Sequence, residues 1–241
     1  MAIKKKDIKL PGSKRHRANL EVQPHEVLST SKAVAALKKY KGCKFDQTVD
    51  CAVFLQLDPK QPDQSIRGSV AMPNGIGKSK KVVAFVPPEM EKVALEAGAI
   101  KAGGEELARE VEKGWMDFDV AIASPDMMRV ISKLGRVLGP KGLMPSPKAG
   151  TVTADIKTAV KEYVAGKIEF RNDKAGNIHA PIGKFSFSEG DLKANLEHFI
   201  KAIEATRPNT IKGAYIRKIA ISATMTPSVL VEIPQHVVVE D

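Results

Sequence analysis

The sequence predicts a mixed fold, in which an α+β domain is interrupted by an inserted α/β domain. Both end stretches contain strands that alternate between apolar and polar residues, together with amphipathic helices, which is typical of half-buried antiparallel sheets. Between them, short apolar strands alternate with helices, which indicates βαβ units and a mostly parallel sheet. We expect residues 1–67 and 159–241 to form one discontinuous domain and residues 68–158 the inserted one, with a double hinge near Gly68 and Thr158.

The first stretch begins with a basic arm at residues 1–17, which either becomes ordered on a phosphate backbone or remains a solvated tail. A helix should then begin after the N-cap Ser29 and run to about Tyr40. Thr48–Leu57 is a predicted strand with one apolar face, which puts the Cys51 thiol in the core and argues against a metal role for it.

The middle stretch supplies the alternating elements of the inserted domain. Ser124 is the predicted cap of the last helix, and the stretch ends in the Gly/Pro-rich run Leu138–Gly150. The predicted elements are strands at Lys81–Val86 and Val120–Ala123 and helices at Glu89–Ala97, Glu105–Lys113 and from Pro125, the last burying Met128, Val130, Ile131, Leu134 and Val137.

In the last stretch, a strand at Lys167–Arg171 should turn at residues 172–176 and pair back along Asn177–Pro181. Ser188 should cap a long helix that ends before Pro208, and Tyr215–Thr224 should form the last strand. The long helix has apolar residues at helical spacing, namely Leu192, Leu196, Phe199, Ile200 and Ile203.

The charge balance favours a polyanionic partner. The 38 Lys and Arg outnumber the 28 Asp and Glu, which gives a net charge of +10 and a pI near 9.5, and such an excess is typical of RNA- or DNA-binding proteins. Cys43 and Cys51 are the only cysteines, which favours a reducing cytosol. With neither a signal-peptide-like apolar run nor a stretch of ~20 apolar residues, we expect a cytoplasmic protein without a membrane partner.

Enzyme motifs are incomplete. Gly75-Ile76-Gly77-Lys78-Ser79 looks like the end of a phosphate-binding loop, but Met72 stands where that loop needs glycine, so a flexible basic turn is the preferred interpretation. The strand ending at Val86 is followed by Pro87-Pro88 rather than a dinucleotide-binding glycine motif. We therefore expect no catalytic residues, metal, cofactor or small-molecule substrate, and a nucleotide enzyme is a distant alternative.

The polar sheet face of the discontinuous domain is the candidate binding surface. Hydroxyl, amide and ammonium groups can donate to phosphates and 2′-hydroxyls, and an aromatic side chain can stack on a ribose or base. An ordinary solvated sheet face remains open as the alternative. The candidate residues are Lys44, Phe45, Arg171, Asn172, Lys174, Lys218, Ser222 and Thr224.

The run Leu138–Thr153, LGPKGLMPSPKAGTVT, resembles the L-one family of large-subunit ribosomal proteins. The resemblance covers about residues 14–231 and implies a split RNA-binding domain with a Rossmann-like insertion. Further blocks stand in the family's order, at Ser65–Gly68, Phe118–Asp126, Phe170–Lys174, Ile178-His179, Lys212-Gly213 and Ser222–Met225.

The resemblance implies a function on the ribosome. It implies binding of large-subunit (23S) rRNA at the mobile stalk near the tRNA exit site, help in releasing deacylated E-site tRNA, and repression of the operon's own mRNA through its leader. A free-standing RNA-binding translational regulator is the alternative. We expect a cytoplasmic, ribosome-associated protein that is a monomer when free.

Residue roles also follow from the resemblance. It assigns RNA contacts to Phe45 on ribose, to the hydroxyls of Thr48 and Thr224, to Met225 in a shallow groove, and to Asp173, which either orders the hairpin or accepts from a 2′-hydroxyl.

In the inserted domain, Lys141 and Lys148 should add basic contacts. Thr226, next to Met225, is a further candidate RNA contact. Three positions depart from the family pattern. Thr226 replaces the usual glycine, which puts the local backbone geometry in question, Lys141 replaces Arg and Ser146 replaces Asn.

Overall fold

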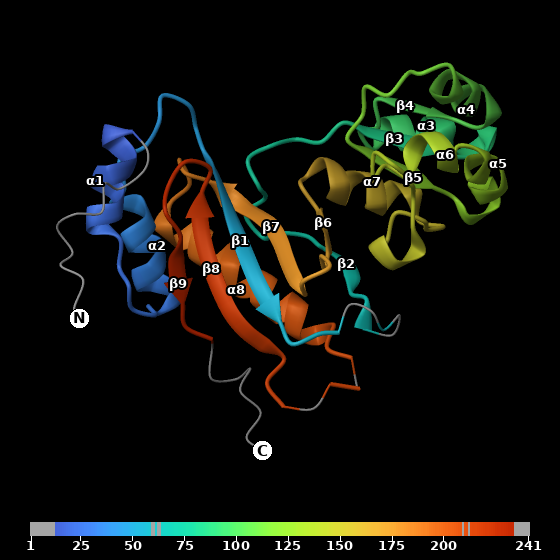
Figure 1. The fold of residues 1–241 in the computed structure, drawn as a ribbon. Coiled ribbons are helices and arrows are strands. Elements are labelled where there is room, and N and C mark those ends of the chain that lie inside the picture. Colours follow the sequence, from blue (N-terminus) through green and yellow to red (C-terminus); the bar gives the residue numbers. More distant parts are fainter. Residues whose placement is uncertain (1–12, 59–60, 62–63, 209, 212, 234–241) are drawn as a thin grey trace.

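The computed structural model describes residues 13–58, 61, 64–208, 210–211 and 213–233. Figure 1 shows two lobes that are joined by two crossings of the chain. The outer lobe holds an antiparallel sheet backed by helices, and the α/β lobe holds a parallel sheet between helices. The predicted combination of α+β and α/β structure is therefore confirmed.

The outer lobe is built on a four-stranded sheet with the order β7-β1-β8-β9, in which all neighbouring strands are antiparallel. Helices α2 and α8 cover one face of this sheet. The elements are α1 (Lys14–Val22), α2 (Thr30–Lys38), β1 (Thr48–Leu55), β7 (Asn177–Lys184), α8 (Glu189–Ala205), β8 (Ile216–Ala223) and β9 (Val229–Val231).

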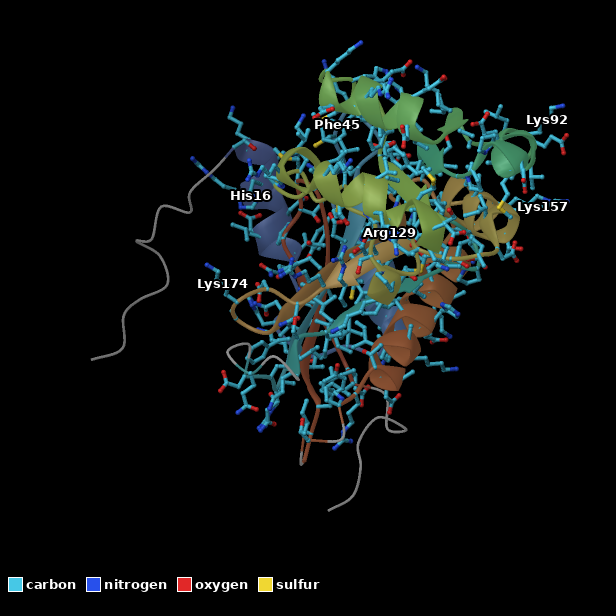
Figure 2. All side chains as sticks on the ribbon, turned by 90° about the vertical axis from the view of Figure 1, so that its right-hand side faces the viewer. His16, Phe45, Lys92, Arg129, Lys157 and Lys174 are labelled. Carbon is cyan, nitrogen blue, oxygen red and sulfur yellow. The ribbon has the colours of Figure 1, made fainter. Side chains whose placement is uncertain are left out.

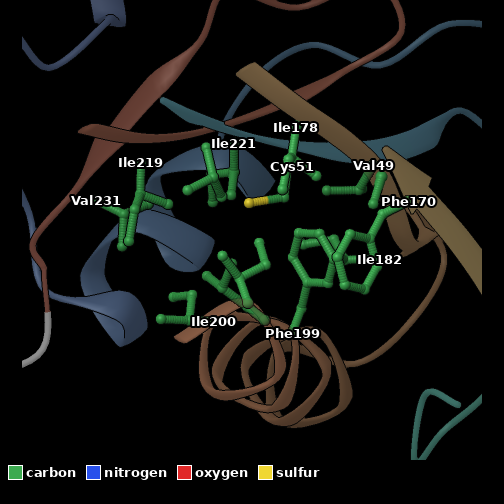
Figure 3. Close-up of a cluster of buried hydrophobic side chains, with 14 of the residues drawn as sticks. Val49, Cys51, Phe170, Ile178, Ile182, Phe199, Ile200, Ile219, Ile221 and Val231 are labelled. Atoms are coloured by element: carbon green, nitrogen blue, oxygen red, sulfur yellow. The ribbon is translucent and has the colours of Figure 1, made fainter. Parts of the chain in front are cut away.

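The core of the outer lobe follows the predicted alternation. Val49, Cys51, Val53 and Leu55 of β1 are all buried. Figure 3 shows Cys51 on the sheet side, opposite Phe199 and Ile200 of α8. Ser188 caps α8 as predicted: its hydroxyl oxygen accepts from the amide of Asp191 at 3.1 Å and donates to the Asp191 carboxylate at 2.7 Å. The five apolar residues predicted for this helix are all buried.

The two thiols should differ in reactivity. Burial raises the pKa of Cys51 to about 12, and only a thiolate attacks disulfide reagents, whereas Cys43 is partly exposed. We expect Ellman's reagent to modify one thiol in the folded protein and the second only after unfolding. The variant Cys43→Ser should then show no fast reaction, and rapid modification of both thiols in the folded state would argue against the buried position of Cys51.

The α/β lobe has a parallel sheet with the order β4-β3-β5. Helices α3 and α7 pack on one face, and α4, α5 and α6 on the other. The elements are β3 (Val82–Phe85), α3 (Pro88–Glu96), β4 (Lys101–Gly103), α4 (Glu105–Glu112), β5 (Val120–Ala123), the 3₁₀ turn η2 (Pro125–Met127), α5 (Met128–Lys133), α6 (Gly135–Leu138), the 3₁₀ turn η3 (Pro147–Ala149) and α7 (Ile156–Val164).

The helix expected from Pro125 is broken into η2, α5 and α6. Its second break precedes Gly135, and glycine is a poor helix former. Ser124 makes no capping bond there, and its buried hydroxyl has no hydrogen-bond partner among the residues that the structure describes. Of the predicted buried positions Ile131 and Leu134 are buried, whereas Met128, Val130 and Val137 are only partly covered.

A two-stranded ribbon lies at the junction of the lobes and corrects the predicted hairpin. Strand β6 (Ile168–Arg171) pairs along its length with β2 (Arg67–Val70), and β7 pairs with β1. The turn itself forms where predicted, but within the described residues the strand pairing between its two arms is limited to the bridge between Asn172 and Ile178. The partners of β6 and β7 are therefore the sequence-distant strands β2 and β1. A local turn pattern in the sequence does not reveal such long-range pairing.

The crossings between the lobes lie beyond the predicted hinge positions. Val70 and Ile76 pack in the core of the outer lobe, and Tyr163 of α7 packs in that of the α/β lobe. The chain thus changes lobe between Ile76 and Val82, and again between Tyr163 and Ile168. Hinge motion at these crossings remains a prediction. In the described part of the chain, every helix is too short or too polar to cross a membrane.

The motif Gly75-Ile76-Gly77 forms a turn that is held on the outer lobe. Gly75 and Gly77 have φ of +63° and +70°. The fully buried Asn195 accepts from the amide of Asn74 at 3.1 Å and donates to the carbonyl of Gly75 at 2.9 Å. A Cβ atom at residue 77 would stand 2.7 Å from Cγ of Lys184, so the backbone can lie this close only because Gly77 has no side chain.

Gly77→Ala should lower the free energy of unfolding by about 1–3 kcal/mol, since alanine disfavours positive φ and would also collide with Lys184. The matched control is Gly142→Ala. Gly142 has the same φ of +70°, but a Cβ atom there would meet nothing within 4 Å. Urea unfolding should show a larger loss in the free energy of unfolding for Gly77→Ala than for Gly142→Ala. Equal losses would mean that the close approach to Lys184 does not contribute to the effect.

Candidate nucleic-acid interface

One face of the outer sheet is left uncovered by α2 and α8 (Figure 1). We call it the open face. It is formed by alternate residues of three neighbouring strands: Thr48, Asp50, Ala52 and Phe54 of β1, Lys218, Ala220 and Ser222 of β8, and Asn177, His179, Pro181 and Lys184 of β7. The strand register thus brings Lys218 and Ser222 onto the same face as Thr48.

The first end of the open face is organised around Thr48. The Thr48 hydroxyl oxygen accepts from Nζ of Lys184 at 3.0 Å, which leaves the hydroxyl hydrogen able to donate outward. The backbone amide of Thr224 donates to the carbonyl of Thr48 at 3.1 Å, and the Thr224 hydroxyl lies 3.3 Å from the same carbonyl oxygen. The two threonines predicted to bind RNA are therefore adjacent, although they come from opposite ends of the sequence.

Two exposed apolar side chains flank this end. Phe45 is 54% exposed and Met225 is 48% exposed. The Met225 amide donates to the side-chain oxygen of the buried Gln47 at 2.9 Å, and the Phe185 amide donates to the backbone carbonyl oxygen of Gln47 at 2.8 Å. Gln47 thus fixes the turn after β8. Apolar groups held outward in this way suit stacking on ribose or base.

Thr226 fits this turn without strain. Its hydroxyl oxygen accepts from the amide of Ala223 at 2.9 Å, and its own amide donates to the carbonyl of Ala223 at 3.0 Å. Within the described residues, positive φ occurs only at glycines. The backbone at this position therefore has no need of the glycine that the family usually carries.

The second end of the open face is the turn between β6 and β7. The Asp173 carboxylate accepts from the amides of Asn177 and Ala175, each at 2.8 Å, and these hydrogen bonds, chiefly those with Asn177, hold its pKa below the usual range. Asp173 therefore orders the turn. Arg171 and Lys174 are exposed beside it, and Lys174 points away from the ribbon in Figure 2.

Asn172 connects this turn to the junction of the lobes. Its side-chain oxygen accepts from the amide of Ile66 at 2.8 Å. The turn residues and Ser65 surround a shallow recess.

The predicted RNA-binding residues of the outer lobe lie at two separate ends of the open face. At ~3.4 Å per residue, strand β1 spans about 25 Å between these ends, so the residues do not form a single cluster.

The second-domain residues lie apart from the open face. Lys148 is in η3, which packs against β2, and Lys141 follows α6; both side chains are exposed. In Figure 2, Lys92 and Lys157 mark a further edge of the α/β lobe. In the described part of the chain, no three His, Cys, Asp or Glu side chains gather as a metal-ligand set.

Sequence reasoning missed four residues of the outer site, namely Gln47, Asp50, His179 and Lys184. The predicted return strand ends at Pro181, whereas β7 continues to Lys184. Continuing the strand would have placed Lys184 beside Thr48. Gln47 gives no sequence signal, because its importance comes from burial against a turn far along the chain.

Comparison with known proteins identifies the family of this chain. Residues 37–227 match the model of the ribosomal protein L1p/L10e family. The chain is 56% identical over 219 residues to large ribosomal subunit protein uL1 of Rhodopirellula baltica, which covers 91% of this chain and 97% of that protein. It is 48% identical over 218 residues to the protein of the same name from Thermus thermophilus, covering 90% and 95%. On a match that spans most of the chain, and on relatives this similar over nearly their whole length, the protein belongs to the ribosomal protein L1p/L10e family.

Proposed function

We propose that this protein is a constituent of the large ribosomal subunit and binds large-subunit (23S) rRNA through the open face of the outer lobe. One observation carries the proposal: at one end of that face, the exposed Phe45 and Met225 flank Thr48 and Thr224 on a chain of net charge +10. The family is one of structural, RNA-binding proteins rather than of enzymes.

The chemistry of the face suits structured RNA. Lysine and arginine side chains stand at both ends, where they would neutralise phosphates and release counterions. Hydroxyl groups between them suit 2′-hydroxyls, and exposed apolar groups suit unstacked bases or riboses. These basic residues are Lys44, Lys218, Arg171 and Lys174.

Association with the subunit is tested by sedimentation. A tagged chain expressed in its own host should travel with large subunits in a sucrose gradient and leave them at high salt, because phosphate contacts weaken as salt rises. Recovery only in the slow fractions, with an mRNA attached, would favour the alternative of a free-standing RNA-binding translational regulator. The free protein should sediment as a monomer.

We further propose that the bound rRNA is the mobile stalk near the tRNA exit site, and that the protein assists release of deacylated tRNA. Two crossings that join separately packed lobes support this, because the α/β lobe with Lys141 and Lys148 can then follow the stalk. A covalent cross-link between the lobes should slow tRNA release from ribosomes that carry the protein. Unchanged release from the cross-linked particles would exclude lobe motion as the cause.

Repression of the protein's own mRNA is proposed on the same face. If the leader presents a structure like the stalk, the two RNAs must compete, since both would contact Thr48 and Thr224. Stalk RNA added to a complex of the protein with the leader transcript should therefore displace that transcript. Simultaneous binding of both RNAs would place the repressor site elsewhere.

A further inference from the structure

A pocket opens at the Thr48 end of the open face. It forms where β1, β7 and the turn after β8 meet the Gly75–Lys78 segment. Its lining residues are Thr48, Asp50, Ile76, Lys78, Pro181, Lys184 and Thr224.

The unusual member of this set is Asp50, a carboxylate in the middle of a surface that should bind a polyanion. Its side chain is partly buried, and burial raises its pKa, against the opposing charges of His179 and Lys184. Across the described residues, no side chain or amide donates a hydrogen bond to it. Desolvating a carboxylate without donors is unfavourable, so the pocket is incomplete until a ligand supplies them.

The other walls restrict what that ligand can be. Ile76, 6% exposed, and Pro181 provide apolar contact for a flat group. Nζ of Lys184 stands near Asp50 and offers a donor beside the acceptor. A phosphate fits poorly, because Asp50 would repel it at close range.

The pocket is held in shape before any ligand arrives. Gly77 lies against Lys184 where a side chain would not fit, and Asn195 ties Asn74 and Gly75 to the sheet, because its amide group also donates to the carbonyl of Ile182 at 2.8 Å. A preformed pocket loses less entropy when it binds. At its mouth, Lys78 is 66% exposed on its side chain and lies 3.9 Å from Asp119.

We propose that this pocket takes one unpaired guanine of the bound RNA. Asp50 accepts from the N1–H and the N2 amine of the base, and the ammonium group of Lys184 donates to O6. Guanine has two donors side by side with an acceptor next to them on one edge, which matches a carboxylate beside an ammonium. The inference rests on the proposed RNA-binding function and names the base that its site reads.

The test asks whether removing the negative charge of Asp50 weakens RNA binding, because simple electrostatics predicts that it would strengthen binding. If Asp50 only repels the RNA backbone, Asp50→Asn should strengthen binding of the full chain to a transcript of the rRNA stalk. If Asp50 holds a guanine, the same change should weaken binding about ten-fold or more, because charge-assisted bonds are lost. Glu232→Gln is the matched control, because this exposed carboxylate of the outer lobe lies outside the pocket. Thermal unfolding of each variant checks that the fold is kept.

A second transcript, made with inosine in place of guanosine, identifies the base. Inosine lacks the N2 amine, so it should weaken binding of the natural chain more than binding of Asp50→Asn. Equal weakening of both proteins, or tighter binding of Asp50→Asn to the guanosine transcript, would overturn the inference. Failure of the natural chain to bind the stalk transcript at all would instead overturn the proposed function.

Discussion

Replacing Phe199 with alanine should lower the free energy of unfolding by about 3–5 kcal/mol, because a large buried side chain is removed and its cavity closes only in part. Phe199 is fully buried in the centre of α8 (Figure 3). Its ring meets Phe170 edge to face, with centroids 5.9 Å apart and planes at 86°. The loss is a large share of the about 5–15 kcal/mol that stabilises a typical domain.

Urea unfolding followed by circular dichroism measures this effect. Lys201→Ala, on the same helix but exposed, is the control and should change stability by less than about 0.5 kcal/mol. A loss below about 1 kcal/mol for Phe199→Ala would mean that the helix does not pack on the sheet as described. Because Phe170 belongs to β6, the change should also loosen the ribbon at the junction.

Asn195→Ala should cost about 2–4 kcal/mol, since each buried backbone group left without a partner costs about 1–3 kcal/mol and part of the site can admit water. The Asn195 side chain is fully buried and serves three backbone groups: the amide of Asn74 and the carbonyls of Gly75 and Ile182. It connects α8, β7 and the segment that leads to the α/β lobe.

The control for this change is Asn74→Ala at the other end of the same contact. The Asn74 side chain is exposed and donates one long hydrogen bond, to the carbonyl of Asp191 at 3.4 Å, so its loss should stay within about 0.5 kcal/mol. Hydrogen exchange should show faster opening of residues 74–78 in Asn195→Ala. Unchanged exchange there would show that the segment is fixed by other contacts.

Local patterns predicted most helices and strands but not their partners. The alternation in β1 and the spacing in α8 identified the core of the outer lobe, because one buried face imposes one period. Helix α7 has Ile156, Val160 and Tyr163 at helical spacing after the cap Asp155, so its sequence does indicate a helix, although the predicted domain boundary falls inside it. Strand β4 has only three residues, which is too short for any period to show.

The candidate site divides in a similar way. Exposed Phe45 and Met225 and the adjacent Thr48 and Thr224 agree with the resemblance, while a function for any of them remains a prediction. Asp50 gave no signal, because an alternating polar residue is ordinary in a half-buried strand. Only the register of β7 and the return of residues 76–78 to the sheet show that its carboxylate lies in a pocket.

Equilibrium binding of the purified chain to a transcript of the rRNA stalk, repeated across salt concentrations, tests the central claim most directly. We predict tight binding that weakens as salt rises and falls by about 1–3 kcal/mol in Thr48→Val or Thr224→Ala, where RNA groups lose their partners. Thr158→Val, at an exposed position on α7, should bind as the natural chain does. If binding is tight but neither Thr48→Val nor Thr224→Ala weakens it, the RNA-binding site lies elsewhere on the protein. If the chain binds the stalk transcript no better than random duplex RNA, the proposed binding of ribosomal RNA is contradicted.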